Sequence, residues 1–181
     1  PGGKSFAAAM AMDNTGSITS CDIHAHKLQL IEKGAQRLGI TCIETACADG
    51  RVFRAEWAGA FDTVLCDVPC SGLGIIRKKP ETRYKDPDEI AKLPALQRAI
   101  LENCARYVKK GGTLVYSTCT IDPTENEEQV AAFLRRHPEF AVATPEIPFP
   151  AGMTVGEHGA LSVPTRTGMD GFFLCAMQKV P

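Results

Sequence analysis

Residues 61–72 read FDTVLCDVPCSG, and residues 112–119 read GTLVYSTC. Each stretch starts with an apolar run typical of a β-strand and then reaches a cysteine, Cys70 in the first and Cys119 in the second. Two parallel strands that end side by side would bring both thiols to one edge of a sheet. In open α/β sheets, ligands bind at the edge formed by the carboxyl ends of the strands. The two stretches therefore predict an α/β fold with a chemically active pair of thiols.

The segments around these stretches alternate between strand and helix patterns. A helix-like stretch ends at Gly39, a residue typical of a helix C-cap, and Thr124 with Glu127 forms a capping-box pattern. This alternation indicates a mostly parallel α/β sheet with an antiparallel late strand, and residues 145–166 are expected to form loops. The expected helices cover about residues 24–38, 88–110 with a break near Pro94, and 124–136. The expected strands cover residues 16–23, 41–49, 61–67, 112–119, 140–146 and 171–180.

The composition is that of an ordinary globular protein. With 181 residues, 44% of them hydrophobic and 23% charged, the chain can form one domain over residues 1–181. No apolar run approaches the roughly 20 residues that cross a bilayer, so no membrane association is expected. The eight cysteines lack the Cys-x-x-Cys pairs of zinc sites, so no metal is expected. Four lie in apolar stretches and are expected to be buried in a protein of the reducing cytoplasm: Cys21, Cys42, Cys66 and Cys175.

The charge distribution bears on nucleic-acid binding. A net charge of -1 argues against a domain that coats nucleic acid through its overall charge. A local basic patch is nevertheless present between residues 77 and 85, made of Arg77, Lys78, Lys79, Arg83 and Lys85. These residues could contact phosphates or simply form a solvated loop.

The chain begins with Pro1-Gly2-Gly3-Lys4-Ser5, followed by a helix-like run. Glycines allow the backbone to approach a ligand closely, and a helix N-terminus favours anionic or polar groups. The same letters match the end of the phosphate-binding pattern G-x-x-x-x-G-K-[ST]. A plain turn into a helix fits them as well.

Two aspartates follow expected strands. Asp22 ends the strand at 16–23, a position from which carboxylates commonly accept hydrogen bonds from ribose hydroxyls. Asp49 ends the next strand, where it could accept a hydrogen bond from an adenine amino group. Either aspartate could instead stabilise a turn. Together with the glycine-rich start, they favour a cofactor that contains adenosine.

The segment Asp67-Val68-Pro69-Cys70 is the more specific signal. Pro69 restricts the backbone and has no N–H to donate. We therefore expect the carbonyl groups around it to face a ligand, with Asp67 and Cys70 pointing into the same pocket. Nearby helix N-termini and basic residues would favour a thiolate on Cys119. The run of residues 125–128, ENEE, is expected mainly to complement the dipole of the following helix.

Six motifs resemble the NOP/Sun family of RNA cytosine-C5 methyltransferases. In chain order they are PGGK, the aspartate of CDI, ADGR, DVPCSGLG, YSTCTIDPTENEEQV and DGFF, within residues 1–179. Val68 stands where alanine is usual, and Thr120 stands where serine is common. Residues 74–80, GIIRKKP, are most similar to bacterial members that methylate a cytosine of small-subunit (16S) ribosomal RNA.

The resemblance implies a Rossmann-like class I methyltransferase fold and S-adenosylmethionine as the methyl donor. Family members carry a central strand and N-terminal RNA-binding parts before the PGGK motif, so the chain is expected to be a truncated catalytic domain. We expect a cytoplasmic monomer that acts on ribosomal RNA.

Site residues follow from the same resemblance. It implies that Cys119 adds to C6 of the cytosine and that Cys70 assists the later elimination. Asp67 would hold the N3/N4 edge of the base, which requires a raised pKa or a shared hydrogen bond that burial would provide. The cofactor would be held by Pro1, Gly2, Gly3, Lys4, Asp22, Asp49 and Asp67. The RNA would be contacted by Pro69, Arg77, Lys78 and Lys79.

Three other functions compete with this one. A P-loop nucleotide-binding protein would explain the Gly-Lys-Ser start but leaves both cysteine segments without a role. A cysteine hydrolase would need a histidine partner for Cys119, and the four histidines stand in no motif. A non-catalytic RNA-binding fragment would keep the RNA contacts without the cofactor.

Overall fold

The protein is described here from a computed structural model, which covers residues 1–144 and 148–180. The chain divides into two compact units, Pro1–Val52 and Phe53–Pro181. Each unit is described by itself, and the expected single domain over residues 1–181 stays a prediction.

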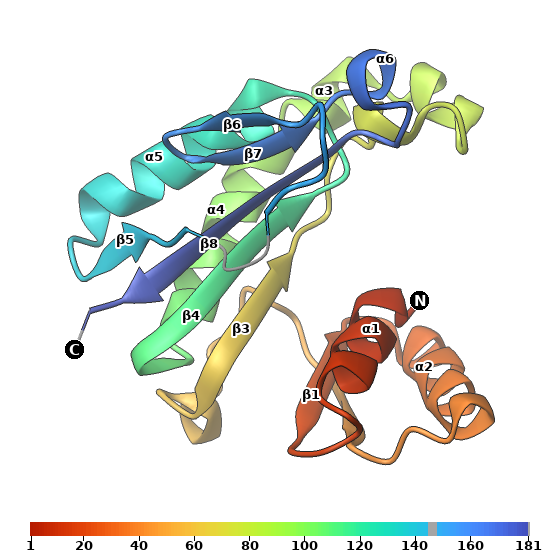
Figure 1. Ribbon diagram of the computed structural model, residues 1–181, viewed down its shortest axis with the longest axis vertical. Coiled ribbons are helices and arrows are strands. Elements are labelled where there is room, and N and C mark those ends of the chain that lie inside the picture. Colours follow the sequence, from red (N-terminus) through yellow and green to blue (C-terminus); the bar gives the residue numbers. More distant parts are fainter. Residues whose placement is uncertain (145–147, 181) are drawn as a thin grey trace. The chain divides into compact units, whose positions relative to one another are not determined.

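The first unit contains two helices and a parallel pair of strands (Figure 1). Its elements are α1 (Gly3–Ala11), β1 (Ile18–Asp22), α2 (Ala25–Leu38) and β2 (Ile43–Cys47). In α2 the buried residues Leu28, Ile31 and Ala35 recur at helical spacing and form its inner face. Gly39 then takes the left-handed conformation at a φ of 68°, which ends the helix as expected from the sequence.

The second unit is built on a mixed sheet with strand order β3-β4-β8-β7-β6, and β5 also pairs with β8. Its strands are β3 (Phe61–Asp67), β4 (Val108–Thr118), β5 (Phe140–Val142), β6 (Thr154–Gly156), β7 (Gly159–Ser162) and β8 (Phe172–Lys179). Its α-helices are α3 (Pro87–Ile90), α4 (Leu93–Ala105), α5 (Glu127–Arg136) and α6 (Pro164–Thr167). Short 3-10 helices cover η1 (Ala55–Trp57), η2 (Leu73–Ile75), η3 (Pro80–Tyr84) and η4 (Pro123–Glu125).

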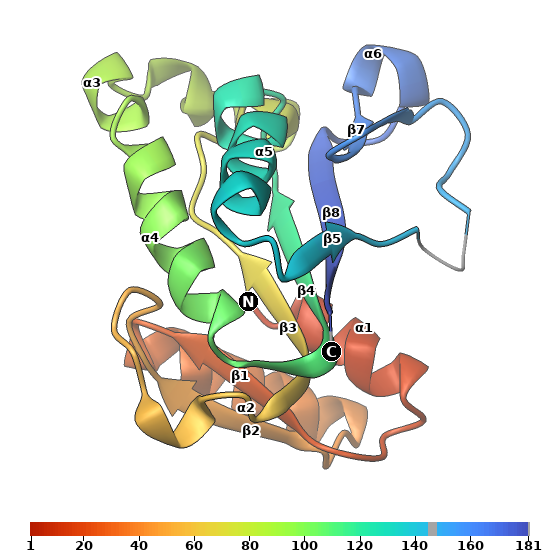
Figure 2. The ribbon, with the colours of Figure 1, turned by 90° about the vertical axis from the view of Figure 1, so that its left-hand side faces the viewer.

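Helices α4 and α5 pack side by side against one face of β3, β4 and β8, as Figure 2 shows in edge view. The core between these layers is apolar and includes Leu101 of α4, Leu114 and Tyr116 of β4, and Phe133 of α5, all at most 1% exposed. Because strands and helices are buried against each other, the ends of β3 and β4 are held in fixed positions.

The sheet is less parallel than the sequence predicts. Only β1 with β2 and β3 with β4 pair in parallel, whereas β4–β8, β5–β8, β6–β7 and β7–β8 are antiparallel. The antiparallel β8 was expected; its further antiparallel neighbours were not. The region 145–166 was predicted as loops, but its described part forms β6, β7 and the start of α6, because Gly156 and Gly159 allow a tight hairpin.

Several predicted boundaries also need correction. The helix expected over 88–110 is broken between α3 and α4, close to Pro94 as expected, but it ends at Ala105, because residues 108–111 belong to β4. The capping box at Thr124 is wrong, since the Asp122 side chain accepts the hydrogen bond from the Thr124 N–H and α5 starts at Glu127. The strand expected over 140–146 is present at Phe140–Val142, and its residues 145 and 146 lie outside the described residues.

The cysteine prediction holds for three of the four residues in apolar stretches. Cys42, Cys66 and Cys175 are buried, but Cys21 is exposed, because its side chain points away from the small core of the first unit. Within the described part of the chain, no helix is long and apolar enough to cross a membrane, and no cluster of three candidate ligands could hold a metal.

Candidate active site

The two thiols predicted to converge lie in contact at the carboxyl ends of β3 and β4. The strands are parallel, and Asp67 pairs with Ser117 in their register. Just beyond these ends, Cys70 Sγ lies 3.0 Å from Cys119 Sγ, and the Cys119 backbone N–H donates to Cys70 Sγ at 3.3 Å. This short approach confirms that two segments far apart in the sequence present both sulfurs at one edge of the sheet.

The surroundings of Cys70 disfavour its ionisation. Its pKa is raised well above the usual range for a thiol, because Cys119 shares a hydrogen bond with it and burial penalises the charged form. At this separation either sulfur can donate its S–H to the other.

Asp67 ends β3 beside this pair. Its Oδ1 accepts a hydrogen bond from Ser117 Oγ at 2.8 Å, so the expected shared hydrogen bond is present. The expected burial is wrong, because the residue is exposed at the end of the edge strand. One carboxylate oxygen is thus oriented by the neighbouring strand in a position open to solvent.

The carbonyl groups of Pro69, Cys70 and Ser71 accept hydrogen bonds from the protein itself, although carbonyls around Pro69 were expected to face a ligand. The Pro69 carbonyl accepts a hydrogen bond from Gln97 Nε2 at 2.9 Å. Lys85 Nζ donates to the carbonyls of Ser71 at 2.7 Å and Cys70 at 3.3 Å. These bonds hold the Cys70 loop from both sides, because Gln97 comes from α4 and Lys85 follows η3.

A contact between two glycines holds the Cys119 loop. The Gly74 N–H donates to the Cys119 carbonyl at 3.1 Å, and the Gly171 N–H donates to the Gly74 carbonyl at 2.7 Å. A Cβ added to Gly74 would lie 2.2 Å from the Gly171 carbonyl oxygen, so only glycine permits this approach. The SGLG and DGFF motifs are thus joined next to Cys119.

Two of the predicted RNA-binding residues form ion pairs in the structure. Arg77 Nη2 and Lys78 Nζ lie 3.3 Å and 2.5 Å from the carboxylate of Asp170, whose side chain is 5% exposed. These cations lower the pKa of the Asp170 carboxyl, with Lys78 the larger cause. Both basic side chains remain largely exposed, and their contact with RNA stays a prediction, as does that of Lys79 and Pro69.

The predicted cofactor residues lie in the first unit, apart from Asp67. Gly2 precedes α1 in the left-handed conformation, and a Cβ there would collide with the Phe6 ring. Asp22 Oδ1 accepts a hydrogen bond from the His24 N–H. Asp49 pairs with Arg51, whose hydrogen bonds lower the pKa of Asp49 to about 2. Both aspartates therefore stabilise turns, and their contact with a cofactor stays a prediction.

Sequence reasoning missed the polar residues behind the loops. Glu125 and Asn126 were expected mainly to complement a helix dipole, but both are fully buried ahead of α5. Gln97 was not singled out, although it is also fully buried. The only sequence signal was the position of Glu125 and Asn126 shortly after Cys119, and a glutamine inside an amphipathic helix gives none.

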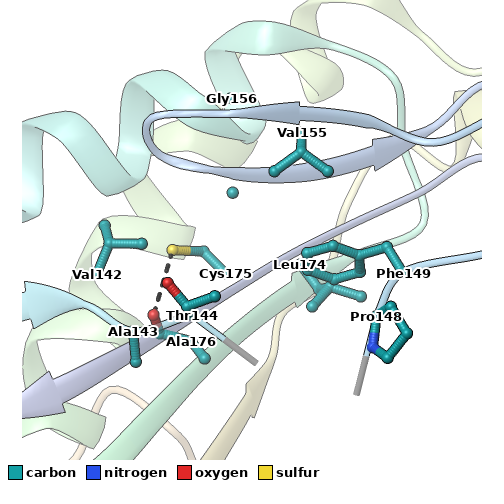
Figure 3. Close-up of a pocket in the computed structure, with 11 residues that line it drawn as sticks. Val142, Ala143, Thr144, Pro148, Phe149, Val155, Gly156, Leu174, Cys175 and Ala176 are labelled. Carbon is teal, nitrogen blue, oxygen red and sulfur yellow. Dashed lines mark hydrogen bonds between the residues drawn. The ribbon is translucent and has the colours of Figure 1, made fainter. Parts of the chain in front are cut away.

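Two pockets open in the second unit. One has a volume of about 310 Å³ and adjoins Cys70, and its other lining residues are Lys85, Asp86, Glu89, Ile90 and Leu93. The other, of about 220 Å³, is apolar and lies among β5, β6, β7 and β8 (Figure 3). Cys175 points into it, and burial raises the pKa of this thiol to about 12, so it stays protonated and is a structural group.

The fold is that of a class I methyltransferase. An S-adenosylmethionine-dependent O-methyltransferase from Thermotoga maritima superposes with a TM-score of 0.54 over 98% of this chain and 55% of its own, at 15% identity, a likeness in fold alone. Within this class of methyltransferases, the two cysteines beyond the ends of β3 and β4 are the more specific feature. The family model described as 16S rRNA methyltransferase RsmB/F matches residues 1–178, and the chain belongs to this family.

Individual relatives agree with this assignment. The chain is 46% identical over 187 aligned positions to the probable ribosomal RNA small subunit methyltransferase B of Bacillus subtilis, covering 99% of this chain and 41% of that protein. The crystal structure of NSun6 from Pyrococcus horikoshii with SFG has a TM-score of 0.83 at 26% identity, covering 100% of this chain and 46% of that one. The chain thus spans less than half the length of these relatives.

Proposed function

We propose that this protein transfers a methyl group from S-adenosylmethionine to C5 of a cytosine in 16S ribosomal RNA. The observation that carries the proposal is the 3.0 Å approach of Cys70 Sγ and Cys119 Sγ at the ends of two parallel strands. Membership of the RsmB/F family and the likeness to a small-subunit methyltransferase of Bacillus subtilis support the reaction and the substrate.

The first unit offers groups that fit the cofactor. A Cβ on Gly3 would meet nothing within 4 Å, so the start of α1 leaves room for a ligand against the backbone. Asp22 and Asp49 end or follow β1 and β2, where carboxylates can accept hydrogen bonds from ribose and adenine. When bound, S-adenosylmethionine supplies the methyl group that C5 receives. The residues that would hold it are Pro1, Gly2, Gly3, Lys4, Asp22, Asp49 and Asp67.

Cys119 activates the base. C5 of cytosine is a poor nucleophile, so direct transfer to it would be slow. The Cys119 thiolate adds to C6, where its electron pair forms the S–C6 bond and the C5–C6 π electrons make C5 nucleophilic. Asp67, oriented by Ser117 through one oxygen, holds the N3/N4 edge of the ring as negative charge develops there.

Cys70 completes the reaction. After transfer, C5 carries both the methyl group and its original proton. The Cys70 thiolate accepts this proton, the electrons of the C5–H bond restore the C5–C6 double bond, and the electrons of the S–C6 bond return to Cys119. The main cause of the raised pKa of Cys70 is its hydrogen bond with Cys119, and this cause is removed while Cys119 is bonded to C6. Cys70 therefore becomes a better base at the step that needs one.

The RNA must present an unstacked cytosine, since C5 and C6 are inaccessible within a duplex. The pocket of about 310 Å³ beside Cys70 is large enough for a flipped pyrimidine. Arg77, Lys78 and Lys79 would contact phosphates, and Pro69 would lie against the nucleotide. We further propose that the protein acts in the cytoplasm as a monomer without a metal.

The decay of the covalent adduct is expected to depend on pH. The Cys70 thiolate accepts the proton, and burial still raises the pKa of Cys70 after its hydrogen bond with Cys119 is lost, so the reactive fraction grows as pH rises. The decay rate should increase by about tenfold per unit between roughly pH 6.5 and 8.5, below the pKa of the thiol. Quenched-flow measurements of labelled adduct at each pH check this, and a decay rate that does not change with pH would contradict the role of Cys70.

The function itself is tested in a strain that lacks the gene. Mass spectrometry of its 16S ribosomal RNA should show the loss of one 5-methylcytosine, restored by the intact gene. An unchanged set of modified nucleotides would refute the proposal. Calorimetric titration distinguishes the methyltransferase from the alternative of a P-loop nucleotide-binding protein. Affinity for magnesium-ATP without affinity for S-adenosylmethionine would favour the P-loop protein.

A further inference from the structure

Two consecutive buried residues connect the loops that carry the cysteines. Glu125 and Asn126 are both 0% exposed and lie between Cys119 and helix α5. The Tyr116 hydroxyl, from the interior of β4, donates to the Glu125 carbonyl oxygen at 2.7 Å. This bond fixes the position of the two residues relative to the strand that leads to Cys119.

The Glu125 side chain holds the loop of Cys70. Its Oε2 accepts a hydrogen bond from the Ser71 N–H at 2.9 Å and another from Gln97 Nε2 at 2.7 Å. The same Gln97 nitrogen donates to the Pro69 carbonyl at 2.9 Å. Glu125 is therefore linked, directly or through one side chain, to the residues on both sides of Cys70.

The Asn126 side chain holds the loop of Cys119 in a similar way. Its Oδ1 accepts a hydrogen bond from Thr118 Oγ1 at 2.6 Å, and its Nδ2 donates to the Thr120 carbonyl at 3.0 Å. These are the residues on both sides of Cys119. The two loops also contact each other through the hydroxyls of Ser71 and Thr120, which lie 2.7 Å apart.

Stability of the fold does not fully account for this arrangement. Glu125 Oε1 and Gln97 Oε1 are buried and have no hydrogen-bond partner among the described residues. A buried acceptor without a partner costs free energy, and such groups in folded proteins call for an explanation. An apolar pair in their place would avoid this cost but would leave the Ser71 N–H and the Pro69 carbonyl without partners.

We propose that Glu125 and Asn126 are positioning residues with separate roles, Glu125 for Cys70 and Asn126 for Cys119. The inference rests on the proposed function, because the two sulfurs act there at different steps. Asn126 orients the sulfur that forms the adduct, and Glu125 orients the sulfur that resolves it. Substitution of each residue therefore slows a different step.

The test measures formation and decay of the covalent RNA adduct under single-turnover conditions, in the protein as its gene encodes it. Glu125→Ala should form the adduct at the normal rate and resolve it about tenfold more slowly, so that the adduct accumulates. Asn126→Ala should form it about tenfold more slowly and resolve it normally, without accumulation. If Glu125→Ala and Asn126→Ala slow the same step, the inference is overturned.

Conservative substitutions sharpen the result. Glu125→Gln keeps an oxygen that can accept from Ser71 and Gln97, so adduct decay should recover. Asn126→Asp keeps the acceptor for Thr118 but sets an oxygen against the Thr120 carbonyl, so adduct formation should stay slow. Gln97→Ala removes the bond to the Pro69 carbonyl and one of the two bonds that Glu125 accepts, but it keeps the Ser71–Glu125 bond. It should therefore cause partial accumulation, which keeps the test decisive if Glu125→Ala fails to fold.

Gln129→Ala serves as the matched control. Gln129 is 5% exposed, and its side chain donates to the Thr124 carbonyl at 2.9 Å. Among the described residues, this side chain makes no hydrogen bond to a residue beside either cysteine. Its substitution should leave both rates unchanged, and equal effects from it would contradict specific positioning. If the unsubstituted protein forms no adduct, the proposed function fails; if it does and the variants do not separate the steps, only this inference fails.

Discussion

Cys119→Ala is expected to abolish methylation of 16S ribosomal RNA and to prevent any covalent complex with it. Without the sulfur, C5 of the cytosine is not activated, and the loss should be on the order of a thousandfold or more in turnover. Methyl transfer from labelled S-adenosylmethionine to RNA measures the effect. Adduct formation is followed as a band that survives denaturation. Normal turnover would refute the nucleophilic role of Cys119.

Two further variants serve as controls for this result. Cys175→Ala removes a buried thiol of β8, the strand that pairs with β4. Cys175 lies away from the ends of β3 and β4 where Cys70 and Cys119 meet, so this variant should retain activity. Cys119→Ser keeps the shape of the side chain but replaces the thiolate by a hydroxyl that is hardly ionised at neutral pH, so it should remain inactive. An active Cys119→Ser variant would indicate that the residue only fills space.

Cys70→Ala is expected to give the opposite phenotype, the accumulation of a covalent complex between protein and RNA. Cys119 still adds to the base and the methyl group is still transferred, but no group lies 3.0 Å from Cys119 Sγ to take the C5 proton. Decay of the adduct should slow by about a hundredfold or more, the range typical of a lost general base. Gel electrophoresis under denaturing conditions would show the retained RNA.

A double variant shows which cysteine is bonded to the RNA in the accumulated complex. Cys70→Ala combined with Cys119→Ala should show no adduct, because the accumulated complex is attached through Cys119. Full activity without accumulation in the single Cys70→Ala variant would make Cys70 a structural residue. An adduct that persists in the double variant would show that a third group attacks the base.

The cysteine site was predictable from the sequence because its signals are local. The apolar runs before Cys70 and Cys119 indicated strands, and strand ends have a known relation to ligand sites in α/β sheets. The helix that ends at Gly39 was likewise predictable from periodicity and one residue with a positive φ. The motifs around these residues also indicated the family that the comparison confirms.

The errors arose where a local signal competes with distant contacts. Residues 108–111 follow a helix and include Gly111, yet they belong to β4, and Val108 pairs with Phe61 of β3. The capping box at Thr124 failed because Asp122 caps the turn first. The burial expected for Asp67 failed because it ends an edge strand of its sheet.

The order of residues along the chain was thus sufficient to predict most of the longer strands and helices and the two cysteine segments, since each depends on neighbours within a few positions. Folding alone settled how the sulfurs meet and what surrounds them. The Ser71–Glu125 bond spans 54 positions and the Pro69–Gln97 bond spans 28, and no local pattern marks such partners. The antiparallel pairing of β5 and β7 with β8 and the burial of Glu125 belong to the same group, because both follow from packing between distant segments.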